Sequence, residues 1–274
     1  MNRCPTIPTM GREAMLLLLT CGAGSVDAIS YLGLGHVFTA MMTGNTVLLG
    51  LAIGQGHASA AFRSIVALIG FGGGVATGAM IVQRSRADSE WPSAVTGALA
   101  VEGMLLGLFA LLWYFTGAAP GEGARDGLIL ISGFAMGIQS AAVQRLDVPG
   151  VMTTYITGTL TSLFVGLVGR VHSAQRQSPA TGSAGTPVSP VPAAGPKDRR
   201  LGLLAAVFLA YALGASAGGI LLLRLSVSAA LLPLASVAIV TANATIRQRS
   251  GQKEAALAAG TAPAPETFGG PPSY

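Results

Sequence analysis

VFTAMMTGNT, residues 37–46, places polar side chains and a glycine inside a strongly apolar part of the chain. The polar residues are Thr39, Thr43, Asn45 and Thr46, and Gly44 lies among them. Glycine weakens a helix by about 1 kcal/mol relative to alanine, and a buried amide needs hydrogen-bond partners that lipid cannot supply. The stretch therefore indicates a special local structure within a membrane-embedded segment.

The composition of the whole chain indicates the class of protein. Of its 274 residues, 51% are hydrophobic and only 10% are charged, and the mean hydropathy is +0.62. A soluble globular domain carries about 25% charged residues, so too few charges remain here to cover a water-facing surface. Apolar runs long enough to cross a bilayer recur along the chain, and helices satisfy their own backbone groups in lipid. The sequence predicts an all-α polytopic membrane protein.

Six apolar runs are strong candidates for transmembrane helices, and two Thr/Gly-rich segments are ambiguous. The strong runs are residues 14–34, 64–82, 94–115, 127–143, 201–223 and 227–244. The ambiguous segments, residues 37–54 and 148–169, each follow the preceding run after a very short turn. Counted as full spans they give eight helices, and counted as half-helices or re-entrant segments they give six.

Basic residues predict the orientation of the chain in the membrane. With either span count, most of the 16 Lys and Arg residues fall on the side of the two termini, which satisfies the positive-inside rule. We therefore expect both termini in the cytoplasm. The net charge of +5 reflects these flanking residues. Nucleic-acid binding is not expected, because no basic patch is interleaved with aromatic residues.

The polar segments divide the chain into a cytoplasmic N-terminal tail (1–12), a first membrane half (13–117), a second membrane half (126–246) and a C-terminal tail (247–274). The second half contains a loop, residues 171–200, that is rich in Pro, Ser and Gly. We expect this loop to be flexible and cytoplasmic, and the C-terminal tail to be disordered. Either could bind a partner, although an inert linker is the simpler interpretation.

Enzymatic and cofactor chemistry has no support in the sequence. Cys4 and Cys21 offer neither a disulfide framework nor metal-ligand spacing. The chain has no Walker loop and no HExxH motif, so an intramembrane enzyme is not expected. The expected partners are the lipid bilayer and an unknown small solute or ion. A homo-oligomer would add further copies of the chain.

The opening stretch has a second copy later in the chain. VMTTYITGTL, residues 151–160, matches it at a constant offset of 114, with Val37, Thr39, Thr43 and Gly44 each repeated. Each copy follows a Gly-rich helix, and each is followed by an apolar stretch, a polar loop and two strong runs. We interpret the chain as a two-fold internal repeat. Eight spans would make the repeats parallel, whereas six would make them inverted, as in many secondary transporters.

Two uses of the repeated Thr-Gly elements remain open. In inverted-repeat transporters, Gly-interrupted segments in corresponding positions of the halves build the central site. Small residues spaced four apart also let helices pack closely, and the pairs Gly70/Gly74, Gly133/Gly137, Gly214/Gly218 and Gly103/Gly107 have this spacing. We favour packing for the glycine pairs. For the Thr-Gly elements, a binding site and helix packing are about equally well supported, because the amide of Asn45 needs hydrogen-bond partners.

Acidic side chains within the strong runs are Asp27 and Glu102. A charge at the centre of a membrane helix costs about 2.5–3.5 kcal/mol on insertion scales, so each should face a partner or a watery cavity. Asp27 lies on the helix that leads into the first Thr-Gly element. We consider an ion or proton site at Asp27, or a charge pair between Asp27 and Arg145. Glu102 has the weaker case, because no polar neighbour accompanies it.

Two motifs carry a family resemblance: GAGSVDAISYLGLGHVFTAMMTGNTVLLG (residues 22–50) and GFAMGIQSAAVQRLDVPGVMTTYITGTLTSL (residues 133–163). With them, the chain resembles the YoaK-like family of bacterial inner-membrane proteins, a domain of unknown function, over residues 13–249. The resemblance implies a bacterial plasma-membrane protein of about six spans, and it implies no substrate or catalytic residue. The Pro-rich loop after His172 is an insertion relative to the family pattern.

The sequence favours a small secondary transporter or permease-like carrier, with a site near the midplane between the two Thr-Gly elements. The candidate substrate or ion ligands are Asp27, Thr43, Asn45, Gln139, Thr157 and Thr159. The alternative is a non-transporting membrane scaffold or accessory subunit, in which the same residues serve only packing and hydrogen bonding.

Overall fold

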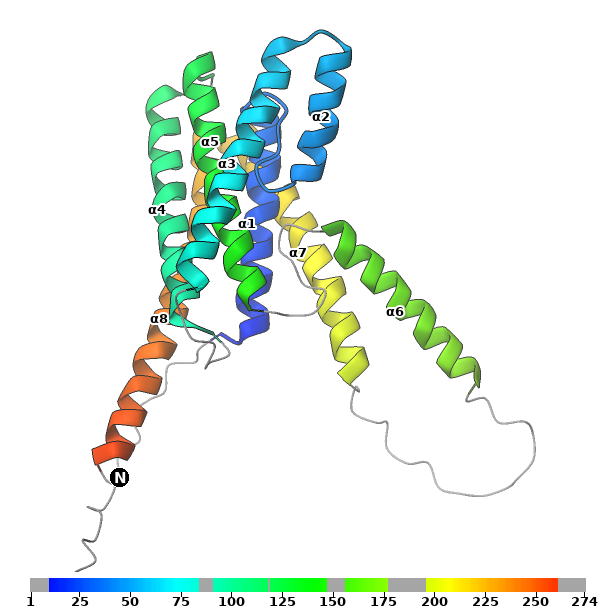
Figure 1. Cartoon of the computed structure of the whole chain (residues 1–274), viewed down its shortest axis with the longest axis vertical. Coiled ribbons are helices and arrows are strands. Elements are labelled where there is room, and N and C mark those ends of the chain that lie inside the picture. The colour runs from blue at the N-terminus through cyan, green and yellow to red at the C-terminus, as the bar shows by residue number, and fades with distance from the viewer. Residues whose placement is uncertain (1–9, 84–90, 118, 147–155, 177–195, 261–274) are drawn as a thin grey trace, which may run out of the picture.

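The computed structural model describes residues 10–83, 91–117, 119–146, 156–176 and 196–260 (Figure 1). Every regular element in these ranges is a helix. In chain order they are α1 (Arg12–Gly33), α2 (Met42–Gly54), α3 (Ala58–Gln83), α4 (Ser93–Thr116), α5 (Glu122–Arg145), α6 (Ile156–Arg176), α7 (Pro196–Leu225), the short 3₁₀ helix η1 (Ser226–Ala230) and α8 (Leu231–Gly260). The prediction of an all-α fold is confirmed for the described residues.

Length and composition separate the helices into two groups. Within the described residues, 5 helical segments are long and apolar enough to cross a membrane: α1, α3, α4, α5 and the stretch Arg200–Gln252, which joins most of α7, η1 and α8. Shorter apolar helices are Met42–Gly54 and Thr157–Val168. Both lie in the segments that were ambiguous in sequence. The second is part of α6, which runs for 21 residues, whereas α2 has only 13.

The path of the chain shows where the shorter helices lie. In Figure 1, α1 rises through the bundle, the chain returns to mid-height, and α2 rises again to the end that α1 reached. Helix α3 then descends, α4 rises and α5 descends. Helix α6 begins near mid-height and descends, and α7 and α8 form a hairpin around η1. Helices α2 and α6 therefore both begin near mid-height, at the outer side of the bundle, and run toward opposite ends.

Glycines allow two close helix contacts, α1 against α7 and α3 against α5. A Cβ atom at Gly218 would lie 2.7 Å from the carbonyl oxygen of Ser25, and one at Gly70 would lie 2.7 Å from that of Leu130. Small residues permit such close backbone approach. The predicted packing role is confirmed for these glycines. At Gly103, in contrast, a Cβ would lie 3.5 Å from Val237 Cγ1, an ordinary van der Waals distance.

Large apolar side chains cover the outside of the bundle as well as its core. Buried core residues include Leu16, Leu99 and Met136, whereas Phe115 and Leu223 are 76% and 79% exposed. Large exposed apolar patches are unusual on a soluble monomer. Their abundance here is typical of a surface that faces lipid.

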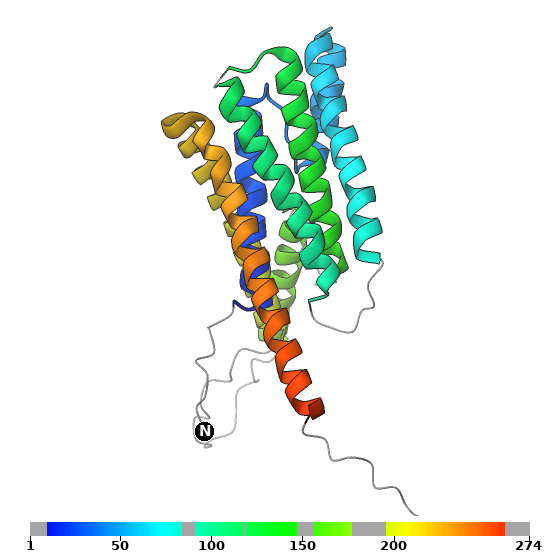
Figure 2. The same cartoon turned by 90° about the vertical axis from the view of Figure 1, so that its left-hand side faces the viewer.

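Two predicted boundaries are wrong. The C-terminal tail was expected to be disordered from residue 247, but α8 continues to Gly260. At about 1.5 Å per residue, its 30 residues reach about 45 Å, and the last turns extend beyond the other helices (Figures 1 and 2). The expected loop 171–200 is also shorter, because α6 reaches Arg176 and α7 begins at Pro196. Hydropathy misses these turns because polar residues extend helices past the apolar core.

Candidate functional site

The connection between α1 and α2 turns sharply back toward the middle of the bundle. Gly35 and His36 have φ angles of +90° and +64°, a left-handed conformation that glycine adopts readily and other residues rarely do. The His36 amide donates to the Tyr31 carbonyl at 3.0 Å. The Tyr31 ring lies edge-on to the His36 ring at 5.1 Å and stacks on the Phe38 ring at 5.0 Å. These contacts define the turn.

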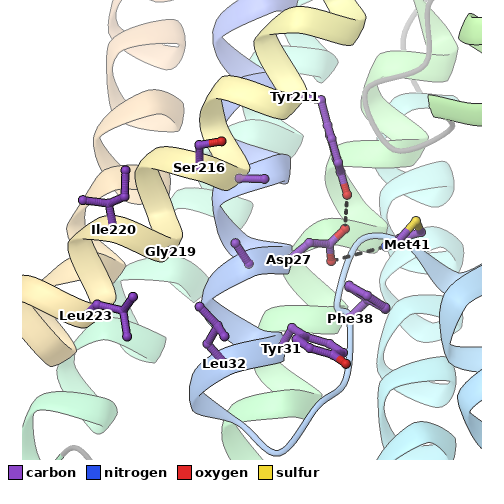
Figure 3. A pocket seen from close by; sticks show the side chains of 12 residues that line it. Asp27, Tyr31, Leu32, Phe38, Met41, Tyr211, Ser216, Gly219, Ile220 and Leu223 are labelled. Atoms are coloured by element: carbon purple, nitrogen blue, oxygen red, sulfur yellow. Dashed lines mark hydrogen bonds between the residues drawn. The ribbon is translucent and has the colours of Figure 1, made fainter.

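Asp27 holds the returning segment from α1. Its side chain is only 2% exposed. The backbone N–H groups of Thr39, Ala40 and Met41 donate to Asp27 Oδ1 at 2.8, 2.7 and 3.4 Å. The Tyr211 hydroxyl, from α7, donates to Asp27 Oδ2 at 2.5 Å (Figure 3). One carboxyl group therefore joins α1, the returning segment and α7.

Asn45 fastens the other side of the same segment. Its Oδ1 accepts the Phe38 N–H at 2.9 Å, and its Nδ2 donates to the Phe38 carbonyl at 2.5 Å. The Ser30 and Thr39 hydroxyls form a further buried hydrogen bond at 3.0 Å. Backbone groups outside a helix must be satisfied inside the protein when they lie at membrane depth. The polar residues of the opening stretch meet that requirement.

A pocket lies beside Asp27, between α1 and α7 (Figure 3). Its volume is about 590 Å³. Apart from Asp27 and Tyr211, its lining is mostly apolar or aromatic and includes Tyr31, Leu32, Phe38 and Leu223. The arrangement places one carboxyl group at the wall of an open, mostly apolar groove.

The remaining predicted site residues are more scattered. Thr43 is exposed in the first turn of α2. In the second Thr-Gly element, Thr157 is exposed and Thr159 is 1% exposed, while residues 151–155 lie outside the described part of the chain. Buried Gln139, on α5, donates through Nε2 to the Leu19 carbonyl at 3.3 Å. The structure thus brings Asp27 and Asn45 to one segment, whereas Gln139 of α5 contacts another part of α1, at Leu19.

The predicted Asp27–Arg145 charge pair is wrong. Asp27 instead accepts hydrogen bonds from the returning segment and from Tyr211. Arg12, at the start of α1, donates to the carbonyl of Leu146, so the Arg145 end of α5 lies beside the start of α1. Asp27 follows Arg12 by four helical turns, or about 22 Å at 1.5 Å per residue. Arg145, on α5, therefore lies near the start of α1, far from Asp27.

Two features of the polar interior differ from expectation. Sequence reasoning missed Tyr211, which lies 184 residues from Asp27. A hydroxyl-bearing aromatic residue three positions before Gly214, within an apolar helix, was the available signal. Glu102 is fully buried, and neither of its carboxyl oxygens has a hydrogen-bond partner in the described part of the chain.

Comparisons with known proteins agree with the class that this architecture defines, a multi-pass helical membrane protein. A family described as "Protein of unknown function (DUF1275)" matches residues 15–244, so the chain belongs to that family. It is also 46% identical, over 160 residues, to the UPF0700 transmembrane protein YoaK of Bacillus subtilis (strain 168). That match covers 58% of this chain and 69% of the relative. No solved structure matches the chain. The predicted YoaK-like resemblance is confirmed.

Proposed function

We propose that this protein is a small secondary carrier of the bacterial inner membrane, with both termini cytoplasmic. Its six spans would be α1, α3, α4, α5, α7 and α8. The observation that carries the proposal is that α2 and α6, at the outer side of the bundle, begin near its mid-height and run toward opposite ends (Figure 1). Half-helices in corresponding positions of two inverted halves build the central site of many secondary transporters.

Contacts at the two glycine-rich interfaces support an inverted repeat. A Cβ atom at Gly24 would collide with the Tyr211 carbonyl, and one at Gly137 would collide with the Phe71 carbonyl. Gly24 and Gly137 are 113 positions apart, and Tyr211 and Phe71 are 140 apart.

A second pair of close contacts repeats the same two sequence offsets, 140 and 113 positions. Gly214 faces the Cys21 carbonyl, and Gly74 faces the Phe134 carbonyl. Under this correspondence α1 matches α5 and α3 matches α7. Each matched helix runs in the opposite direction to its counterpart (Figures 1 and 2), as inverted repeats require.

The substrate site of the carrier would lie where the first half-helix begins. Asp27 and Asn45 fix the returning segment there, and the pocket between α1 and α7 opens beside it. Thr159, buried on α6, occupies the position that corresponds to Asn45 in the second Thr-Gly element and lies outside the lining of this pocket. Movement of the returning segment would require Asp27 or Asn45 to exchange hydrogen-bond partners, which links the site to a change of shape.

A scaffold remains the second candidate, and a specific observation favours it. All four hydrogen bonds to Asp27 come from the protein itself. A side chain satisfied in this way can serve purely to hold three segments together. The two candidates differ in the access of water-soluble reagents to the half-helices. In a carrier they reach these helices from both sides of the membrane, and in a scaffold from one side only.

Thiol labelling of intact cells tests the topology. In a chain with Cys4 and Cys21 replaced by Ala, a single cysteine is introduced at exposed Ser59 or at exposed Ser250. Intact cells are then treated with a membrane-impermeant maleimide. Six spans require Ser59→Cys to react from the periplasm and Ser250→Cys only after the membrane is opened. Labelling of both positions from one side would refute the inverted repeat.

Thiol accessibility at the half-helices tests carrier against scaffold. Thr43→Cys and Thr157→Cys would be labelled in right-side-out and in inside-out vesicles. A carrier that alternates between two open states exposes each position to both sides of the membrane. A static scaffold would label each position from one side only, and that result would overturn the carrier proposal.

A further inference from the structure

The carboxyl group at the wall of the α1/α7 pocket has no cationic partner in the described part of the chain. Within the described residues, no Lys, Arg or His side chain lines the pocket, and the four donors to Asp27 are three backbone N–H groups and a phenol. Burial disfavours the charged form of a carboxyl group, and hydrogen bonds from such donors offset only part of that cost. The ionised group would therefore gain from an opposite charge that a ligand brings into the pocket.

The rest of the lining indicates what kind of cation would fit. Tyr31 and Phe38 present stacked rings beside Asp27, and Tyr211 adds a third ring. Aromatic faces attract cations within about 6 Å of the ring centre, most strongly when water is excluded. A small inorganic ion would have to lose its hydration shell to bind against such an apolar lining, which costs free energy. An organic cation with an apolar body fills the pocket without that cost.

The mouth of the pocket faces outward from the bundle. Leu32, Ile220 and Leu223 line it, and they are 50%, 58% and 79% exposed. These side chains lie on the outer surfaces of α1 and α7, which face hydrocarbon if the helices span the membrane. A ligand entering there would partition into the bilayer before it binds.

We infer that this pocket binds lipophilic organic cations, with Asp27 as the counter-charge and the rings of Tyr31, Phe38 and Tyr211 around the cationic centre. The inference rests on the carrier proposed above and names the class of its substrate. Its competitor for the same groove is an uncharged lipid chain, which would use the apolar lining and ignore the carboxyl group.

Two probes of nearly equal shape and opposite charge test the inference. The full chain, purified and placed in phosphatidylcholine nanodiscs, is titrated with tetraphenylphosphonium and with tetraphenylborate by equilibrium dialysis. We expect saturable binding of the cation and none of the anion above the level of empty nanodiscs. Equal binding of both probes, or binding that does not saturate, would overturn the inference and leave a lipid chain as the occupant.

Substitutions assign the binding to the carboxyl group. Asp27→Asn keeps an oxygen that can accept from Thr39 and Ala40 but removes the charge, and we expect it to weaken cation binding at least tenfold. Glu102→Gln is the control, because it removes a buried carboxyl group outside the pocket lining, and we expect unchanged affinity. An Asp27→Asn protein that binds the cation as well as wild type would also overturn the inference.

The test stays decisive if Asp27→Asn fails to fold. The control is then a neutral compound of similar shape, triphenylphosphine oxide, on the wild-type protein. It must fail to displace bound tetraphenylphosphonium. Absence of cation binding would leave the labelling at Thr43 and Thr157 unaffected, so the carrier could stand with a different substrate. Cation binding without two-sided labelling would identify a binding protein that does not transport.

Discussion

The α1/α7 and α3/α5 contacts share a backbone geometry and differ in chemistry. In each, a glycine of one helix faces a carbonyl of the other, Gly214 against Cys21 and Gly74 against Phe134. Near the first contact, the Tyr211 hydroxyl bonds to Asp27. At the positions that correspond in our proposed repeat, the second contact has Phe71 and Ser140. A carboxyl–phenol pair on one side is thus matched by a phenyl ring and a small hydroxyl on the other.

This difference separates what packs the helices from what makes a site. Glycine fixes how closely two helices approach, and both contacts use it in the same way. The side chain three positions after Gly24 or Gly137 then decides whether the neighbouring space is polar. If the halves descend from one ancestral unit, only the first has a charged group at this position.

Substituting the facing glycines should break both contacts and have the largest effect. In Gly214→Leu and Gly74→Leu, the new side chain would collide with backbone that cannot move aside. We expect each to destabilise the protein by about 3 kcal/mol or more, measured as loss of the monodisperse peak after heating in detergent. Gly72→Ala is the matched control, because a Cβ there meets nothing within 4 Å. A stable Gly214→Leu protein would contradict the close contact.

Removing the Asp27 carboxyl group should affect only the first contact. Asp27→Ala leaves the N–H groups of Thr39 and Ala40 without their acceptor, and each unsatisfied buried donor costs about 1–3 kcal/mol. We expect a loss of about 3 kcal/mol in the same heating assay, with Asp27→Asn falling between alanine and wild type. Ser140→Ala tests the corresponding position of the second contact. A larger loss from Ser140→Ala than from Asp27→Ala would reverse the comparison.

Tyr211→Phe makes the first contact resemble the second. It removes the hydrogen bond to Asp27 Oδ2 but keeps the ring, so we expect a loss of about 1.5 kcal/mol, typical for a bond to a charged group. Phe208→Tyr, one turn earlier on the same helix, controls for altered polarity on α7. No change in stability on Tyr211→Phe would show that the phenol is not bonded to the carboxyl group.

The exposed threonines of the two Thr-Gly elements should matter least for stability. Thr43→Ala and Thr157→Ala alter side chains at the surface of α2 and α6, and surface changes of this kind stay within about 0.5 kcal/mol. Heating curves that match wild type within that margin are expected for both. A loss of more than about 1 kcal/mol from either would indicate a buried role in the second conformation of a carrier.

The sequence predicted the long helices and part of the candidate site correctly. The apolar runs located the long helices, because lipid requires about 20 apolar residues whatever the tertiary fold. Asn45 and Gly44 correctly marked residues 37–54 as unlike an ordinary span, since an amide in hydrocarbon needs a local partner. The partner of Asp27 could not be predicted, because α1 meets α7 only through tertiary packing. Arg145 was chosen for its charge, yet α5 places it at the far end of α1.

Helix α8 makes the protein easier to image than its size suggests. A chain of only 27.5 kDa gives weak contrast in electron cryo-microscopy. Because α8 runs about 15 Å beyond the thickness of a typical hydrocarbon core, a soluble helical domain joined in register near Gly260 would inherit the direction of the helix. Such a rigid fiducial would project from one face of the bilayer and orient every particle.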